Sequence, residues 1–304
     1  MVEQLNSIID SLSLDHKRGA SEIVRDAAEL FVAISLHGEA NPEGANHLFE
    51  RAVKRLAKGQ PTMAPVLNLL NRLSLMREKC GDDWQEFNAA IPGIFRLPMD
   101  YMELMIHHLR ELPEAENLIA FSNSSTVAQI IIAAFNSFGW PQKVYCGEGR
   151  PVMEGLVLAH KLTAAGLNVT LFTDAALMSR ISEIDAVWVG GDSLSRDGLV
   201  NKVGSRALAM LAQHQKKHFI SLMSSDKLLP TDLTPYFYSA PQNPREIGAD
   251  DAETLNIHNE YYESIPIDLV SYIFTENGLA LPDAVVSKIE NEPLSPLFSK
   301  LVTK

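Results

Sequence analysis

The stretch NLIAFSNSSTVAQIIIAAFNSFGWPQKVYCG, residues 117–147, decides the fold. An apolar run at 117–122 leads into an amphipathic stretch at 126–139, and a second apolar run follows at 143–147. Continuous apolar strands that alternate with amphipathic helices are typical of a parallel sheet covered on both faces. The sequence therefore predicts an α/β domain whose sheet starts near Asn117.

The same alternation continues toward the C-terminus. Further strands are expected at 169–174, 186–191, 218–224 and 269–278, and helices at 151–166, 175–181 and 205–215, with one terminal helix at 283–304. Residues 231–270 are less regular and are rich in turn formers and charge, so they suit a lid, an interface loop or a solvated connection. Parallel sheets bind ligands at the carboxyl ends of their strands, which directs the search for a site to those ends.

Apolar residues are spaced differently in residues 1–112. Apolar residues recur there at helical spacing, and the helical runs end at glycines such as Gly38, Gly59 and Gly81. We therefore expect two domains, a helical domain at 1–112 and an α/β domain at 113–304 with a mainly parallel sheet.

Composition excludes several classes of protein. The 26 basic and 38 acidic residues give a net charge of −12, which argues against broad nucleic-acid binding. The two cysteines, Cys80 and Cys146, are too few for a disulfide framework or a zinc cluster, so we expect no metal and a reducing cytoplasm. The start of the chain lacks the pattern of a signal peptide, and no apolar run is long enough to span a membrane.

Hydroxyl groups gather where the first strand meets its helix. Ser124, Ser125 and Thr126 would stand beside the backbone N–H groups of a helix N-terminus, an arrangement that suits a phosphate. The alternative is helix capping, because Thr126 and Gln129 fit a capping box. The usual glycine-rich nucleotide loops are absent from the sequence.

Charged residues follow the next strands. Arg150 could reach a ligand carboxylate or phosphate, or could form a surface ion pair. Asp192 ends the apolar run at 186–191, and Asn201 and Lys202 follow it. The alternative for this segment is a turn held by local hydrogen bonds. A carboxylate at a strand's carboxyl end is placed for acid–base chemistry if desolvation raises its pKa.

Six short motifs, taken in order, resemble one family. They are RGAS (18–21), GQPTMAP (59–65), AFSNSS (120–125), GRPVMEG (149–155), GGDSLSRDGLVNKVGS (190–205) and FTENG (274–278). Together they are similar to the motifs of the alpha, beta and delta subunits of translation initiation factor 2B. That family includes methylthioribose-1-phosphate isomerase and ribose-1,5-bisphosphate isomerase.

The resemblance implies a helical N-terminal domain, a Rossmann-like C-terminal domain and a homodimer. It also implies a phosphorylated small molecule as ligand, with no cofactor. Family isomerases convert an aldose 1-phosphate into a ketose phosphate with a cysteine and an aspartate, whose places are taken here by Ser122 and Asp192. By motif and position, the expected substrate-binding residues are Arg18, Gly19, Ala20, Ser21, Gln60, Ser124, Ser125, Thr126, Arg150, Asn201, Lys202 and Lys227.

Three departures from the isomerase pattern leave the function open. Ser122 replaces the catalytic cysteine, Phe121 replaces its neighbouring histidine, and Gln60 replaces an arginine. A serine hydroxyl is a far poorer base than a thiolate unless a partner activates it. One hypothesis is therefore a protein that binds a phosphorylated sugar or nucleotide with altered or absent catalysis. The alternatives are a sugar-phosphate isomerase with a changed base and a regulatory subunit in translation initiation.

Overall fold

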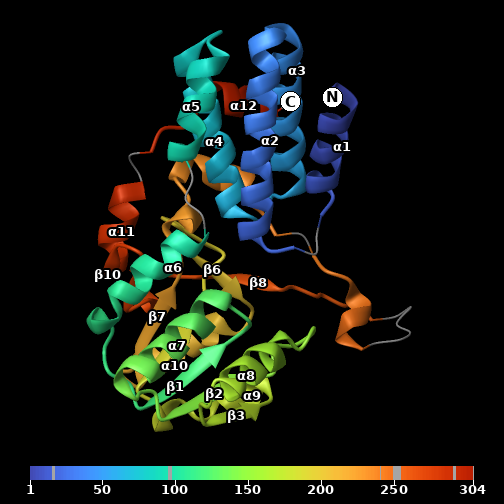
Figure 1. Ribbon diagram of the computed structural model, residues 1–304. Helices are drawn as coiled ribbons and strands as arrows, with labels where there is room; N and C mark the ends of the chain where they lie inside the picture. Colours follow the sequence, from blue (N-terminus) through green and yellow to red (C-terminus); the bar gives the residue numbers. More distant parts are fainter. Residues whose placement is uncertain (16–17, 95–97, 240, 249–254, 290–291, 304) are drawn as a thin grey trace. The chain divides into compact units, whose positions relative to one another are not determined.

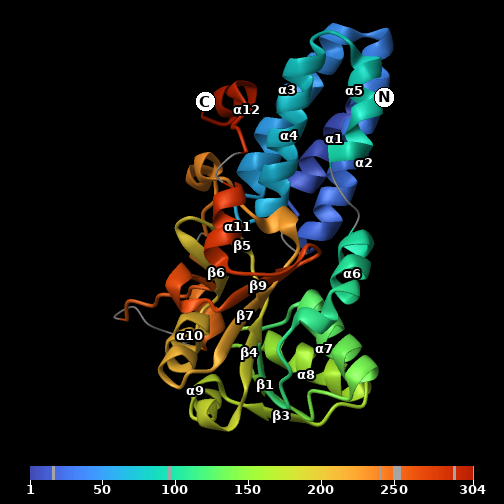
Figure 2. The same cartoon turned by 90° about the vertical axis from the view of Figure 1, so that its left-hand side faces the viewer.

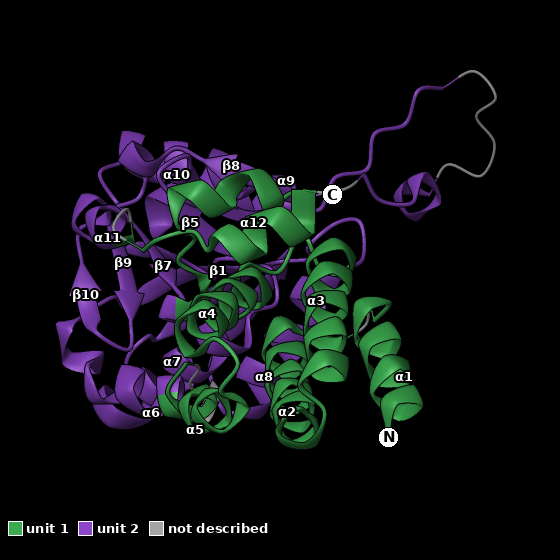
Figure 3. Ribbon diagram, turned by 90° about the horizontal axis from the view of Figure 1, so that it is seen from above, with its two compact units in different colours: residues 1–100, 226–238, 289–304 green, residues 101–225, 239–288 purple. Residues whose placement is uncertain are grey.

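The computed structural model describes residues 1–304 except 16–17, 95–97, 240, 249–254, 290–291 and 304 (Figure 1). The chain groups into two units, which are discontinuous in sequence (Figure 3). The first unit contains residues 1–100, 226–238 and 289–304, and the second contains residues 101–225 and 239–288. The domain boundary expected at residue 112 stays a prediction, because these units are defined by contacts rather than by a single cut.

The first unit is helical. Its principal helices are α1 (Val2–Ser13), α2 (Ala20–Ala40), α3 (Pro42–Gly59), α4 (Ala64–Cys80), α5 (Trp84–Ile94) and α12 (Pro296–Thr303). Fully buried aromatic rings tie three of them together: Phe31 and Phe49 meet edge to face at 5.2 Å, and Phe49 and Phe87 at 5.7 Å between ring centroids. Among the described residues of 1–100 there is no strand, so the predicted helical N-terminal region is confirmed.

The second unit is built on a mostly parallel sheet (Figure 2). Over the residues described, its order is β10-β9-β7-β4-β1-β2-β3, and the pairing of β10 with β9 is antiparallel. The strands are β1 (Asn117–Phe121), β2 (Lys143–Gly147), β3 (Val169–Phe172), β4 (Ala186–Val189), β7 (His218–Leu222), β9 (Tyr272–Thr275) and β10 (Gly278–Ala280). The predicted α/β class is thereby confirmed.

Helices cover both faces of this sheet because successive strand residues point to opposite faces. Leu118, Ala120 and Trp188 share a core with α7 (Ser125–Phe138) and α8 (Glu154–Ala164). The alternate residues of β4 and β7 point to the other face, where α10 (Ser205–His214) packs on both strands. Two shorter helices, α6 (Pro98–His107) and α9 (Asp174–Met178), complete the alternation up to β4. No helix within the described residues is long and apolar enough to cross a membrane.

A second, three-stranded sheet includes the segment after Asp192, for which a turn was the alternative. Strands β5 (Ser193–Ser195), β6 (Gly198–Lys202) and β8 (Tyr262–Ile265) pair antiparallel in that order. The chain turns between β5 and β6 at Arg196 and Asp197. Gly198, the first residue of β6, has a φ of 128°, which favours glycine, and the leucines on both strands are fully buried. Asn201 and Lys202 therefore lie on a strand rather than in a turn, so the turn alternative was wrong for these two residues.

The terminal segment differs from the single helix expected at 283–304. It forms α11 (Pro282–Ile289) and α12, because Pro293 and Pro296 interrupt the helical pattern. The side chain of Asn71 donates to the carbonyl of Pro293 and accepts from the N–H of Ser295, and Phe298 is fully buried in the core of the first unit. Within the irregular 231–270 region, the short helices η4 (Thr231–Tyr236), η5 (Pro244–Ile247) and η6 (Ile267–Leu269) accompany β8. The expected lid includes residues 249–254, which lie outside the described residues.

A close backbone contact fixes where α8 begins. A Cβ atom placed on Gly155 would lie 1.8 Å from the carbonyl oxygen of Gly147, at the end of β2. Gly155→Ala should therefore lower the free energy of unfolding by about 1–3 kcal/mol, because the added methyl group meets backbone that cannot yield locally. Urea unfolding followed by circular dichroism measures the change.

Gly93→Ala is the matched control for this prediction. A Cβ atom on Gly93, in α5, meets none of the described residues within 4 Å, so that substitution should be neutral or should stabilise by up to about 1 kcal/mol. Equal midpoints for Gly155→Ala and the unchanged protein would contradict the close contact.

Candidate functional site

The site is centred on the turn between β1 and α7. Ser122 follows β1 directly and has a φ of 66°, a left-handed conformation that costs a non-glycine residue about 1–3 kcal/mol. The preceding residue, Phe121, is buried with 1% exposure, and its ring lies about 3 Å from the ideal Cβ positions of Gly147 and Gly204. Phe121 is thus a core residue, while Ser122 remains partly exposed at the carboxyl end of the strand.

A carboxylate joins Ser122 to a buried lysine. The hydroxyl of Ser122 donates to Oε1 of Glu154 at 3.2 Å, and Nζ of Lys202 pairs with the same oxygen at 2.7 Å. The side chain of Lys202 is 4% exposed and that of Glu154 is 20% exposed. We call these three residues the Ser122–Glu154–Lys202 cluster. The end of β1, the start of α8 and the end of β6 each contribute one of them.

Glu154 was not among the predicted site residues. It stands in the GRPVMEG motif, at a position where the resembling isomerases carry glutamine or glutamate, and this was the signal that could have identified it. Its Oε2 is buried and has no hydrogen-bond partner among the described residues. That oxygen lies 3.1 Å from the ideal Cβ position of Gly149, so the missing side chain of the glycine leaves room for the carboxylate.

Two tyrosines of the 3-stranded sheet region extend the cluster. The ring centroid of Tyr261 lies 4.9 Å from Nζ of Lys202, which is a cation–π contact. Burial, together with the hydrogen bond that its hydroxyl donates to Glu246 at 2.6 Å, raises the pKa of Tyr261 to about 12. Burial, followed by the negative charges of Asp192 and Glu154, also raises the pKa of Tyr262. Both carboxylates are therefore within electrostatic reach of one phenol.

The polar residues at neighbouring strand ends lie around this turn. Ser124, rather than Thr126, is the N-cap of α7, because its Oγ accepts a hydrogen bond from the N–H of Val127 at 3.3 Å. Ser125 and Thr126 form the start of the helix, so the expected capping box was wrong by two positions. Oγ of Ser124 also lies 3.0 Å from the ideal Cβ position of Gly190, just after β4. The strand ends that carry Ser124 and Asp192 thus come close together.

The hairpin presents the remaining predicted residues. The N–H of Asp192 donates to the carbonyl of Val200 at 2.8 Å, which sets the start of the hairpin against its return strand. The amide of Asn201 donates to Oγ of Ser205 at 3.0 Å, and Asn201 is 5% exposed. Asn201 therefore stabilises the junction between β6 and α10.

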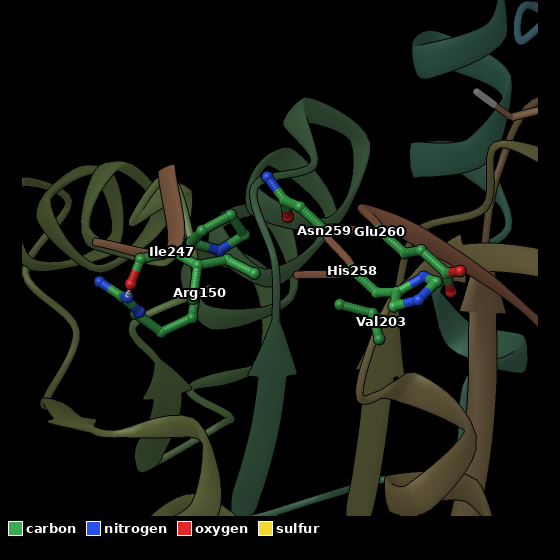
Figure 4. A pocket seen from close by; sticks show the side chains of 7 residues that line it. Arg150, Val203, Ile247, His258, Asn259 and Glu260 are labelled. Carbon is green, nitrogen blue, oxygen red and sulfur yellow. Dashed lines mark hydrogen bonds between the residues drawn. The ribbon is translucent and has the colours of Figure 1, made fainter. Parts of the chain in front are cut away.

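Arg150 borders a pocket of about 410 Å³ (Figure 4). The pocket is lined by Arg150, Pro151, Val203, Ile247, His258, Asn259 and Glu260. The guanidinium of Arg150 donates to the carbonyl of Ile247 at 3.0 Å, whereas its backbone N–H donates to Asp174 at 2.8 Å. Two lining residues, Val203 and Glu260, are the sequence neighbours of Lys202 and Tyr261.

The other six predicted binding residues belong to the first unit. Hydrogen bonds to Asp15, and to a smaller extent to Asp26, raise the pKa of Arg18, which stays a cation. Gly19 is the N-cap of α2, and Ala20 and Ser21 form the first turn of that helix. The convergence of these residues with those of the second unit stays a prediction.

Side-chain hydrogen bonds within the first unit hold Gln60 and the backbone on either side of Lys227. The amide of Gln60, 1% exposed, donates to the carbonyls of Leu12 and Asp15 at 2.8 and 2.7 Å. The amide of Asn68 donates to the carbonyls on either side of Lys227, at 2.7 and 2.8 Å, and so fixes the backbone of that lysine. Gln60 thus has a structural role in holding the start of the chain against α3.

Neither cysteine supplies a thiolate at neutral pH. Cys146 is fully buried in β2, and burial raises its pKa to about 12. Burial also raises the pKa of Cys80, in α4. No group of histidines, cysteines and carboxylates in the described part of the chain could hold a metal ion. The polar chemistry of the site therefore rests on oxygen and nitrogen groups.

Comparison with known proteins finds relatives that match most of the chain. The chain is 26% identical over 285 residues to a ribose 1,5-bisphosphate isomerase of Methanocaldococcus jannaschii, which covers 90% of each chain. It is 26% identical over 309 residues to a methylthioribose-1-phosphate isomerase of Herpetosiphon aurantiacus, covering 92% of this chain and 86% of the relative. These two relatives are sugar-phosphate isomerases by name.

The fold has a solved counterpart. The structure of the translation initiation factor eIF-2B of Pyrococcus horikoshii OT3 superimposes with a TM-score of 0.73 at 23% identity, covering 93% of this chain and 99% of the other. The family model described as "Initiation factor 2 subunit family" matches residues 16–282, which is most of the chain. The protein therefore belongs to the initiation factor 2 subunit family.

Proposed function

We propose that this protein is a sugar-phosphate isomerase that converts an aldose 1-phosphate into a ketose phosphate. The observation that carries the proposal is the Ser122–Glu154–Lys202 cluster, in which a hydroxyl at the carboxyl end of a central strand donates to an ion-paired carboxylate. Ligands of parallel sheets bind at this edge. The names of the two relatives support an aldose 1-phosphate, such as ribose 1,5-bisphosphate, as the substrate class.

The proposed reaction is redox neutral and needs proton transfers at two oxygens and at two carbons. The bond between C1 and the ring oxygen breaks, a proton moves from C2 to C1, and the proton of the 2-hydroxyl ends on the former ring oxygen. Asp192 would serve the two oxygens, first as acid and then as base. A second group would serve the two carbons. General acid–base groups of this kind typically contribute 10²–10⁴-fold each.

Phosphate recognition would use groups that follow β1 and groups at the end of β6. The N-terminus of α7 offers the hydroxyls of Ser124, Ser125 and Thr126 beside backbone N–H groups, and a helix N-terminus attracts anions. Lys202 adds a buried cation, which pairs with Glu154. A phosphate would approach Lys202 through ammonium protons that Glu154 does not engage, so the ion pair and the phosphate contact can coexist.

Binding without turnover is the second candidate function. It is favoured by Ser122, which replaces a thiol with a hydroxyl, and by Gln60, whose amide is engaged by backbone carbonyls.

A homodimer also remains a proposal from the resemblance, and sedimentation velocity would test it.

Turnover separates the two candidates. We expect the purified protein to convert ribose 1,5-bisphosphate or methylthioribose 1-phosphate into the ketose, measured by carbon and phosphorus NMR. Asp192→Asn should lower kcat at least about 100-fold by removing the acid. Asp197→Asn is the control, because Asp197 is an exposed residue of the same hairpin. A ligand that raises Tm but yields no ketose would favour binding alone, and a wild-type protein that neither binds nor converts either sugar would refute the proposal.

Lys202 should contribute both to stability and to ligand affinity. In Lys202→Met, the partly buried carboxylate of Glu154 loses its counter-ion, so the free energy of unfolding should fall by about 1–3 kcal/mol. The double variant Lys202→Met/Glu154→Gln should regain part of that loss, and both variants should bind the sugar phosphate more weakly by calorimetry.

An exposed lysine of the same unit provides the comparison for this prediction. Lys143→Met, at the start of β2, should change neither stability nor affinity appreciably. Unfolding curves and affinities of Lys202→Met that match those of Lys143→Met would show that the ion pair contributes nothing to either property.

A further inference from the structure

Ser122 alone is an inadequate base for a carbon-bound proton, because an isolated hydroxyl is rarely ionised at neutral pH. We propose that Ser122 and Glu154 act together as that base, with the hydroxyl of Ser122 relaying the proton to the carboxylate of Glu154. The inference rests on the proposed isomerase function and assigns the group that takes over the part of the missing thiol.

The geometry supports a relay with the hydroxyl on the ligand side. Oε2 of Glu154 is buried, and Oε1 already receives Ser122 at 3.2 Å and Lys202 at 2.7 Å. Neither oxygen of the carboxylate is therefore open to a sugar carbon. Ser122 is partly exposed at the strand end, so its Oγ is the member of the pair that a ligand can reach.

The acceptor of the relay is rigidly placed. Glu154 is the first residue of α8, and the next residue, Gly155, donates its N–H to the carbonyl of Glu148 at 3.0 Å. The packing of Gly155 against the carbonyl of Gly147 prevents the start of the helix from shifting. The N-terminus of α8 and the ammonium of Lys202 both place positive charge beside the carboxylate of Glu154.

Protons and electrons balance in every step of the relay. After ring opening, the C2–H bond breaks and its electron pair forms the C1=C2 bond of an enol phosphate, which neutralises the positive charge at C1. The released proton bonds to Oγ of Ser122 while the original Oγ–H proton passes to Oε1 of Glu154. Reversal of the relay delivers a proton to C1, and the electrons of the 2-hydroxyl O–H bond form the C2=O bond as that proton leaves to Asp192. Serine is a neutral hydroxyl before and after each transfer.

The test compares Glu154→Gln in two backgrounds. Glutamine keeps the size of Glu154 but cannot take up the proton, so kcat should fall 10²–10⁴-fold with less than about a threefold change in ligand Kd. Ser122→Ala should lose a similar factor. The double variant Ser122→Ala/Glu154→Gln should be no slower than the slower single variant, because residues that act as one unit are not additive.

Cysteine provides a rescue that a structural role for Glu154 would not permit. A thiol with a pKa near about 8.5 forms its own thiolate, so Ser122→Cys/Glu154→Gln should regain turnover relative to Glu154→Gln. Its kcat should rise with pH through the thiol's ionisation, unlike that of the wild type. Unfolding curves for each variant confirm that the compared proteins are folded.

Glu183→Gln is the matched control. Glu183 accepts a hydrogen bond from the hydroxyl of Tyr145 at 3.4 Å and pairs with Arg180 at 3.0 Å, which repeats the hydroxyl–carboxylate–cation arrangement away from the cluster. It should keep wild-type kcat and Kd.

Three results have distinct meanings. Loss of turnover in Glu154→Gln with rescue by Ser122→Cys supports the relay. Wild-type kcat in Glu154→Gln, or an active Ser122→Cys that becomes inactive when Glu154→Gln is added, overturns the relay and leaves the isomerase function standing. Absence of turnover in the wild type and in Ser122→Cys, at saturating ligand, overturns the isomerase function and the relay with it.

Discussion

The ion pair between Lys202 and Glu154 links the two sheets of the α/β unit. Lys202 ends a strand of the small antiparallel sheet, and Glu154 begins the helix that packs on the large one. Withdrawing two charges from water costs several kcal/mol per ion, so such a pair needs close geometry and further hydrogen bonds. The 2.7 Å contact, the hydroxyl of Ser122 and the ring of Tyr261 provide them. The pair also holds the carboxylate of Glu154 beside Ser122, at the exposed end of β1.

Replacement of a thiol by a hydroxyl changes the chemical demands at that strand end. A thiol can ionise by itself, whereas a serine depends on its surroundings. Here the neighbouring aromatic ring of Phe121 is committed to the core and offers no acceptor. The carboxylate of Glu154 is the acceptor that the structure brings to the hydroxyl. Loss of the cysteine therefore does not by itself imply loss of reactivity, and the strained backbone at Ser122 aims the hydroxyl at its partner.

The large sheet could be predicted because its strands are continuous apolar runs with clear boundaries. The hairpin of β5 and β6 was missed because its first strand has only 3 residues, SLS, which carry no long alternation. Glu154 could have been identified from its motif, but its hydroxyl and ammonium partners come from distant parts of the sequence, and local pattern does not report such contacts. Arg18 could be proposed from its motif and Lys227 from its position after a predicted strand, whereas the internal hydrogen bonds of Gln60 became visible only in the folded chain.

The return of the chain to the helical unit has a consequence for biosynthesis. The first 100 residues leave the ribosome long before Phe298, which is fully buried in the core that those residues form. N-terminal segments generally begin to fold during synthesis. Until the last helix is released, the nascent helical unit lacks this aromatic side chain and exposes the apolar surface that it later covers. The nascent chain thus exposes an apolar surface, of the kind that promotes aggregation, until residues 296–303 have been made.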